Sequence, residues 1–331
     1  MVYYPRHIVR IFFKKGLQVM KKIFLLSALL FCVSSYAKEL KVLAIGNSFS
    51  VCVTKNLPQI TASVPGCRII LTSAYIGGCS LERHWNNIDQ KEKKSDKTYA
   101  VSIFDSSDLK SSRKFRGRLS DLLQKNKYDV ITIQQSSVNS IDYSTYQPYA
   151  ANLITNIKKH QPQAEIVIQQ TWSYRSDAVR LKKWNITNAE MFERLSDAYA
   201  KLAKENSSRI IPSGYAVQIF RAETPVKFIP VSDAALKKFK YPDCPSNDGD
   251  VAGMFLWKKN KKSGELKLVR DSNHLNRQGE YMQAALWFSF LFEKPVSEIK
   301  YIPEGIDPEQ AAFLRRCAQK AVDTFKQPSA E

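Results

Sequence analysis

Lys41-Val-Leu-Ala-Ile-Gly-Asn-Ser-Phe-Ser50 has the pattern of a buried strand that runs into a tight turn. Its apolar first half has the length and β-branched content of a parallel strand covered on both faces. Gly46 and Asn47 tolerate the backbone of a strand-to-helix turn, and residues 50–63 read as the following helix. Ser48 is thereby expected at the carboxyl edge of a sheet, where open α/β folds bind ligands. A serine at a helix start is more often a cap than a nucleophile, so Ser48 needs further support.

Strand and helix patterns alternate along the rest of the chain. Further strands are expected at 68–71, 128–133, 164–168 and 209–212, and helices at 119–126, 145–160, 188–205, 214–220, 280–292 and 308–325. This alternation predicts an α/β fold, a three-layer α/β/α sandwich around a parallel, doubly wound sheet of about five strands.

The domain organisation expected from the sequence is a single domain over residues 38–331 with two insertions. The first, at about 86–118, is charged and looks irregular apart from a short strand at 99–104. The second, at about 223–270, holds several prolines, a basic run and a hairpin around Lys262-Ser-Gly264.

Residues 1–37 have the pattern of an export signal. Lys21 and Lys22 precede an apolar run over 23–33, and Ser35-Tyr-Ala37 resembles a cleavage site. The run is too short to span a bilayer, and Met20 is the expected start. We therefore expect a periplasmic or secreted protein cleaved near Ala37. A lipoprotein acylated at Cys32 is the competing interpretation, and membrane attachment is expected only in that case.

The residues after 37 carry 44 Lys and Arg against 31 Asp and Glu, a net charge of +13. The lysines are scattered, and no nucleic-acid motif accompanies them, so a solvated basic surface is favoured over a nucleic-acid partner. Five cysteines remain after Cys32, an odd number without C-x-x-C spacing, which gives little support to a zinc site and leaves any disulfide pairing open.

Asp271-Ser-Asn-His274 precedes the helix expected at 280–292. A catalytic serine needs a base within hydrogen-bond reach, and that base needs a group to fix its tautomer. An Asp-x-x-His turn supplies both from one segment, although an isolated one is more often a simple polar turn.

Three motifs together resemble the SGNH (GDSL-like) hydrolase superfamily, in particular an uncharacterised exported bacterial branch. Gly46-Asn-Ser-Phe49 is similar to its first block, Gly77-Gly-Cys-Ser80 lies where its oxyanion glycine lies, and Asp271-Ser-Asn-His274-Leu is similar to its last block. The resemblance covers about residues 40–292 without the insertions and implies a flavodoxin-like sheet. It implies Ser48 as nucleophile, His274 as general base and acid, and Asp271 as its orienting partner.

The same resemblance implies an oxyanion hole formed by the backbone N–H groups of Ser48 and Gly78. The usual third block, G-x-N-D, is replaced by Gln134-Gln135-Ser-Ser. A glutamine amide donates the same hydrogen bond as asparagine. Gln134 or Gln135 is therefore expected as the third donor, with Asn139 as a weaker candidate and a simple strand-end role as the alternative.

Three further residues are weaker substrate-binding candidates. His84 follows the glycine loop, and Trp172 and Tyr174 follow the fourth strand as an apolar or sugar-stacking wall. An exposed loop histidine and a core tryptophan are the simpler interpretations. An α/β-hydrolase elbow, G-x-S-x-G, is excluded because position 50 is Ser. His84 and His274 lack a clustered third ligand, so no metal is expected.

We therefore expect an exported serine esterase without a cofactor that removes acetyl or short acyl groups from carbohydrate through an acyl-enzyme. The alternative is a catalytically silent glycan-binding envelope protein on the same fold.

Overall fold

The computed structural model describes residues 38–260 and 262–328, which belong to one compact unit. The expected export signal and Cys32 lie outside the described residues. The strands are β1 (Lys38–Gly46), β2 (Cys67–Tyr75), β3 (Tyr99–Asp105), β4 (Asp108–Gly117), β5 (Val130–Ile133), β6 (Glu165–Gln169), β7 (Arg209–Ile211), β8 (Ala252–Lys259) and β9 (Leu266–Leu275). The α-helices are α2 (Ser48–Thr54), α3 (Leu57–Ala62), α4 (Leu81–Asn86), α5 (Leu119–Lys125), α6 (Tyr149–His160), α7 (Val179–Trp184), α8 (Asn188–Glu205), α9 (Ser213–Glu223), α10 (Asp233–Leu236), α11 (Arg277–Phe292) and α12 (Pro308–Thr324). There is also a short π-helix, η1 (Asn87–Lys91), and there are two 3₁₀-helices, η2 (Tyr143–Thr145) and η3 (Val296–Glu298).

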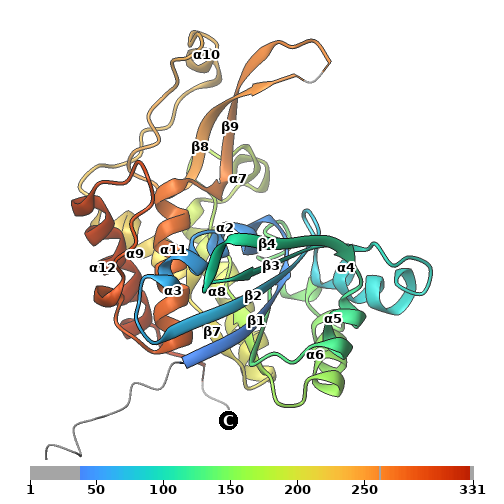
Figure 1. The fold of residues 1–331 in the computed structure, drawn as a ribbon. Coiled ribbons are helices and arrows are strands. Elements are labelled where there is room, and N and C mark those ends of the chain that lie inside the picture. The colour runs from blue at the N-terminus through green and yellow to red at the C-terminus, as the bar shows by residue number, and fades with distance from the viewer. Residues whose placement is uncertain (1–37, 261, 329–331) are drawn as a thin grey trace, which may run out of the picture. The chain divides into compact units, whose positions relative to one another are not determined.

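The central sheet has the strand order β4-β3-β2-β1-β5-β6-β7. Figure 1 labels β4, β3, β2 and β1 side by side in this order. The five strands from β2 to β7 in this order are parallel, and they are the five expected from the sequence. Their order along the chain, second-first-third-fourth-fifth, is that of flavodoxin-like folds. The predicted α/β class with a doubly wound parallel sheet is confirmed.

Helices cover both faces of this sheet. The connection from β1 to β2 moves along the sheet in one direction, whereas those from β5 to β6 and from β6 to β7 move in the other. Because parallel crossovers are right-handed, opposite directions place their helices on opposite faces. Figure 1 shows α3, α9, α11 and α12 on one side of the sheet and α4, α5 and α6 on the other.

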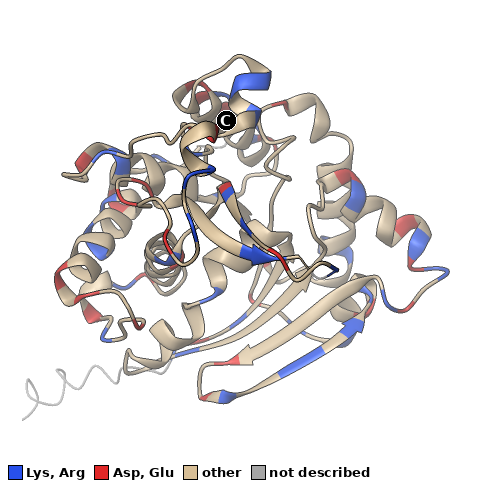
Figure 2. Cartoon of the chain, turned by 90° about the horizontal axis from the view of Figure 1, so that it is seen from above, with Lys and Arg blue, Asp and Glu red and all other residues tan. Residues whose placement is uncertain are grey.

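The first expected insertion is more ordered than the sequence indicates. Besides the strand expected at 99–104, residues 108–117 form β4, so that β3 and β4 extend the sheet as an antiparallel hairpin. The expectation of an irregular segment is wrong here. Nearly every residue of β4 is exposed, so it has no alternation of apolar and polar residues to reveal it. Its lysines and arginines, visible as blue segments in Figure 2, suit an edge strand that must not pair further.

The helix expected at 50–63 is two helices, α2 and α3. Pro58 lies at the start of α3. Its ring has no N–H to continue an earlier helix and clashes with the preceding turn, which breaks the helix before it. The other expected helices agree with α5, α6, α8, α9, α11 and α12 to within a few residues.

The second expected insertion contains the predicted hairpin, now β8 and β9, which pair outside the main sheet. Among residues 38–260 and 262–328, no helix has the length and apolarity needed to cross a membrane. The five cysteines of this part of the chain are all unpaired.

Candidate active site

The turn after β1 presents Ser48 at the start of α2. Asn47 caps this helix, and its Oδ1 accepts a hydrogen bond from the Phe49 N–H at 3.0 Å. A Cβ at Gly46 would lie 2.6 Å from the Ser50 Cβ, so the turn closes only around glycine. The Ser48 N–H belongs to the first turn of α2, where N–H groups have no intrahelical acceptor.

Asp271 and His274 lie in a bulge at the base of the β8–β9 hairpin, not in a free turn. Ala252 pairs with Leu275 but Met254 pairs with Asp271, so three residues of β9 face Gly253 alone. Asp271 Oδ1 accepts from the N–H groups of Asn273 and His274 at 3.3 and 3.1 Å. The bulge thereby turns both side chains to the same side.

The loop after β6 donates two hydrogen bonds to backbone carbonyls of this bulge. The Trp172 Nε1–H donates to the Asn273 carbonyl at 2.8 Å, and the Arg175 N–H donates to the Ser272 carbonyl at 2.9 Å. Arg175 is fully buried and pairs with Asp177 at 2.8 Å. This buried ion pair, which the sequence did not reveal, fixes the loop that positions the bulge.

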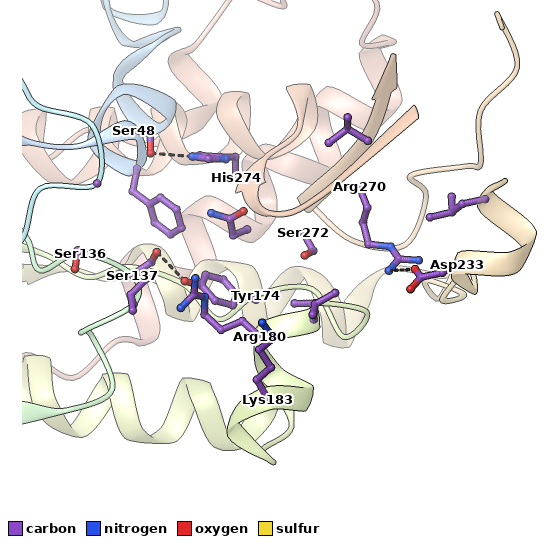
Figure 3. A pocket seen from close by; sticks show the side chains of 18 of the residues that line it. Ser48, Ser136, Ser137, Tyr174, Arg180, Lys183, Asp233, Arg270, Ser272 and His274 are labelled. Atoms are coloured by element: carbon purple, nitrogen blue, oxygen red, sulfur yellow. Dashed lines mark hydrogen bonds and ion pairs between the residues drawn. The ribbon is translucent and has the colours of Figure 1, made fainter. Parts of the chain in front are cut away.

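Ser48, His274 and Asp271 form a continuous hydrogen-bonded chain across 226 residues of sequence. His274 Nε2 lies 2.8 Å from Ser48 Oγ, and His274 Nδ1 lies 2.9 Å from Asp271 Oδ2 (Figure 3). Burial opposes ionisation of Asp271, but hydrogen bonds from His274 and the backbone outweigh it and lower the carboxyl pKa to about 2. An ionised Asp271 accepts the Nδ1–H, which leaves the Nε2 lone pair to accept the Ser48 hydroxyl proton.

Phe49 forms the apolar side of this chain. Its ring stacks on Trp172 with centroids 4.1 Å apart and meets the His274 imidazole edge-on at 5.7 Å. The imidazole is therefore held in its plane by packing as well as by hydrogen bonds.

The glycine loop, residues 77–80, lies beside Ser48. Gly78 has φ +58°, borders the same pocket as Ser48, and would leave an added Cβ with no neighbour within 4 Å. Asn47 Nδ2 donates to the Cys79 carbonyl at 3.0 Å and so joins this loop to the turn that holds Ser48. Gly78 and Ser48 thus border one pocket, and the loop between Gly77 and Ser80 is fixed next to the turn that holds Ser48.

Neither glutamine after β5 lines that pocket, so the expected third donor is wrong on this geometry. The Gln134 Nε2–H donates to Asn47 Oδ1 at 2.6 Å, and the Gln135 amide donates to Thr145 and accepts from Leu81. Both side chains are fully buried. Ser136 and Ser137, which follow them, line the pocket instead, whereas Asn139 does not.

The three weaker candidates have different positions. His84 is buried on α4, 2.9 Å from the Tyr99 hydroxyl and outside the pocket, and its burial lowers its pKa to about 3. Trp172 is a core residue that supports the bulge and does not form a wall of the pocket. Tyr174 does line the pocket, and its hydroxyl donates to Ser137 Oγ at 2.9 Å.

The pocket at Ser48 has a volume of about 1040 Å³. Its walls come from the turn at Ser48, the glycine loop, the residues after β5, α7, α10 and β9 (Figure 3). A second groove of about 460 Å³ also borders Ser48 but lies between α2, α3 and the β2–β3–β4 part of the sheet. Within the described ranges, no cluster of three or more His, Cys, Asp or Glu side chains is arranged to hold a metal ion.

Among solved structures, a crystal structure of a DUF4886 family protein from Bacteroides uniformis is 28% identical, with a TM-score of 0.69 over 89% of this chain and 98% of that one. A candidate SGNH hydrolase from Slackia heliotrinireducens is 20% identical, with a TM-score of 0.40 over 56% of this chain and 84% of the other. Axe2, an acetylxylan esterase from Geobacillus stearothermophilus, is 12% identical, with a TM-score of 0.33 over 55% and 80%. No curated protein matches the chain.

The family model described as a domain of unknown function, DUF4886, matches residues 41–230. That match covers the turn at Ser48 and the glycine loop and ends before Asp271 and His274. The match spans more than half of the chain, and the chain belongs to the DUF4886 family.

Proposed function

We propose that this protein is a serine esterase of SGNH type that removes acetyl or other short acyl groups from carbohydrate. The observation that carries the proposal is the hydrogen-bonded chain from Ser48 Oγ through His274 to Asp271, at 2.8 and 2.9 Å. It couples a hydroxyl to a base and the base to a fixed carboxylate, which is the arrangement of an activated nucleophile.

In the proposed reaction, Ser48 Oγ attacks the ester carbonyl carbon while His274 Nε2 takes its proton. The tetrahedral oxyanion accepts hydrogen bonds from the N–H groups of Ser48 and Gly78. His274 then donates its proton to the departing alcohol oxygen as the C–O bond breaks, which leaves an acyl group on Ser48. Water, deprotonated by His274, attacks this acyl-enzyme and releases the carboxylic acid and free Ser48.

The pocket supports a sugar-sized alcohol. Its volume of about 1040 Å³ reaches the upper end of the range for small-ligand sites. Hydroxyl and amide side chains of Ser136, Ser137, Ser272 and Asn273 line it and supply partners for sugar hydroxyls.

The test is hydrolysis of a chromogenic acetyl ester by the wild type and by Ser48→Ala, with intact-mass analysis after a phosphonate probe. We expect one stoichiometric adduct on the wild type, none on Ser48→Ala, and a rate loss of at least about 10⁴-fold. Ser50→Ala is the matched control, because Ser50 is buried two residues away in the same helix and is expected to leave the rate unchanged. Absence of both rate and adduct in the wild type contradicts the proposal.

A catalytically silent glycan-binding protein is the second candidate. It is favoured by one observation, that neither Gln134 nor Gln135 presents an amide to the pocket as a third oxyanion donor. Glycan affinity shared by the wild type and Ser48→Ala, with no ester hydrolysed by either, would establish this function instead.

We further propose export, with cleavage near Ala37, from the charged and apolar pattern of residues 20–37. Intact mass of the mature protein from its host tests this. A free N-terminus at Lys38 is expected, whereas a mass that includes Cys32 and acyl chains would show a lipoprotein anchored to a membrane.

A further inference from the structure

Basic side chains surround the larger pocket at Ser48. Arg180 and Lys183 reach it from α7, Lys237 follows α10, and Lys267 and Arg270 come from β9. The pocket's one acidic lining residue is Asp233. Figure 3 shows Arg180 and Lys183 extending from α7 into the pocket, on the wall opposite His274.

One of the five cations is neutralised within the protein. Arg270 pairs with Asp233 at 2.8 Å and with Asp177 at 3.2 Å, and its side chain is mostly buried. It therefore fixes α10 against the hairpin and does not offer a free charge.

The other four cations have no carboxylate partner among residues 38–260 and 262–328. They are Arg180, Lys183, Lys237 and Lys267. Arg180 instead lies over the Trp184 ring at 5.5 Å, which holds its guanidinium without neutralising it. A concave site lined by charges of one sign concentrates the opposite charge. The pocket is therefore complementary to an anion.

The position of His274 decides which part of an ester this pocket receives. His274 must protonate the departing alcohol oxygen, and it lines the larger pocket but not the second groove. The alcohol thus lies in the basic pocket, whereas the acyl chain is directed to the groove between α2, α3 and β3. The four cations then select the alcohol and not the acyl group.

Resting on the proposed function, we infer that the alcohol part of the substrate is an acidic sugar, one that carries a carboxylate or sulfate group. Both groups present anionic oxygens to lysine and arginine in the same way. The sugar hydroxyls have partners in Ser136, Ser137, Ser272 and Asn273 of the same pocket.

A binding experiment tests this without turnover. Methyl glucuronide and methyl glucoside differ only at C6, where the first has a carboxylate and the second a hydroxymethyl group. Binding of each to Ser48→Ala is measured by calorimetry at low salt and at 0.5 M salt. We expect the glucuronide to bind at least about tenfold more tightly at low salt, with most of that advantage lost at high salt. Equal affinities overturn the inference.

A kinetic experiment places the effect in the pocket. Mono-acetylated forms of the two sugars, and of the glucoside 6-sulfate, are compared as substrates. The wild type is expected to favour the acidic sugars in kcat/KM by at least about tenfold. The ratio of the kcat/KM for the acetylated glucuronide to that for the acetylated 6-sulfate identifies which anion is preferred. Lys183→Ala combined with Lys267→Ala is expected to raise KM for the acidic sugars by at least about tenfold and so to remove the preference.

Lys182→Ala is the matched control, because Lys182 neighbours Lys183 on α7 but lines a different pocket. It should keep the full preference. If all three acetylated sugars are hydrolysed equally, the inference fails while the proposed function stands. If none is hydrolysed and the phosphonate probe gives no adduct, the proposed function fails, and the calorimetric comparison still decides whether the pocket selects an anion.

Discussion

Gln134 and Asn47 are joined by a 2.6 Å hydrogen bond from the glutamine Nε2–H to the asparagine Oδ1. The same Oδ1 caps α2, and Asn47 Nδ2 holds the Cys79 carbonyl of the glycine loop. The end of β5 is thereby linked to both parts of the proposed oxyanion hole through one side chain. Gln134 lies outside the pocket at Ser48, so its proposed part is to position Asn47.

Gln134→Met is expected to lower kcat by less than about tenfold. The change removes one hydrogen bond but also removes Gln134 Oε1, a buried oxygen with no partner among the described residues. The free energy of unfolding should therefore change by only about 1 kcal/mol. A loss of about 10²–10³ in kcat with the fold intact would instead identify the amide as an oxyanion donor.

Gln135→Met is the contrasting variant. The Gln135 amide joins the residues after β5 to Leu81 and Thr145, so its removal leaves several buried groups unpaired. We expect it to cost about 1–3 kcal/mol in urea unfolding.

Asp271→Asn is expected to lower kcat by about 10⁴-fold with little change in fold. The asparagine Oδ1 still accepts the backbone N–H groups of the bulge, whereas its amide donates to His274 Nδ1. That donation reverses the imidazole tautomer and points an N–H at Ser48. Steady-state kinetics measures the drop in kcat, and circular dichroism checks that the fold is retained. A drop in kcat below about tenfold would show that Asp271 does not orient the base.

The same variant has a signature in acid. The Asp271 pKa lies at about 2 in the folded protein against 3.8 ordinarily, so its stabilisation of about 2 kcal/mol is complete above pH 4 and is lost as the pH falls toward 2. Urea unfolding between pH 5 and pH 2.5 should decline less steeply in Asp271→Asn than in the wild type.

The sequence predicts those features of the fold and of the site that leave a local pattern of residues. The five parallel strands were predictable because they are buried on both faces and read as continuous apolar runs. The exposed strand β4 carries no such pattern. The turn at Ser48 and the Asp-x-x-His segment are local motifs, so both can be recognised in the sequence.

Other features of the site depend on contacts between residues far apart in the sequence, and these contacts could not be predicted. The partner of Gln134 lies 87 residues away, and the burial of His84 depends on β3. The lysines of α7 and β9 look like any solvated surface charge until the hairpin folds over the pocket. These contacts are set by tertiary packing and leave no periodic or local signal.

His84→Phe is expected to make the protein less sensitive to mild acid. Burial lowers the His84 pKa to about 3, so the unfolded chain binds a proton near pH 6.5 that the folded protein does not bind. Stability therefore falls as the pH drops below 6.5, by about 2 kcal/mol at pH 5. Urea unfolding at pH 7.5 and pH 5 should show this loss in the wild type and not in His84→Phe.

His160→Phe, at the end of α6, serves as the control for that measurement and should retain the loss. An undiminished decline in His84→Phe would show that other groups govern acid stability.

The groove between α2, α3 and β3 predicts the acyl-chain preference. It borders Ser48 with about 460 Å³ of space, lined in part by Val51, Ala100 and Phe104. Each additional methylene buried there contributes about 0.8 kcal/mol, so the kcat/KM for p-nitrophenyl butyrate should be at least that for acetate. Ala100→Phe fills the groove and should abolish the gain for butyrate while acetate hydrolysis continues. Leu109→Phe, on exposed β4 and outside the groove, should keep the wild-type profile. A wild type that prefers acetate severalfold would place the acyl group elsewhere, because a chain extending into open groove space gains apolar contact and loses none.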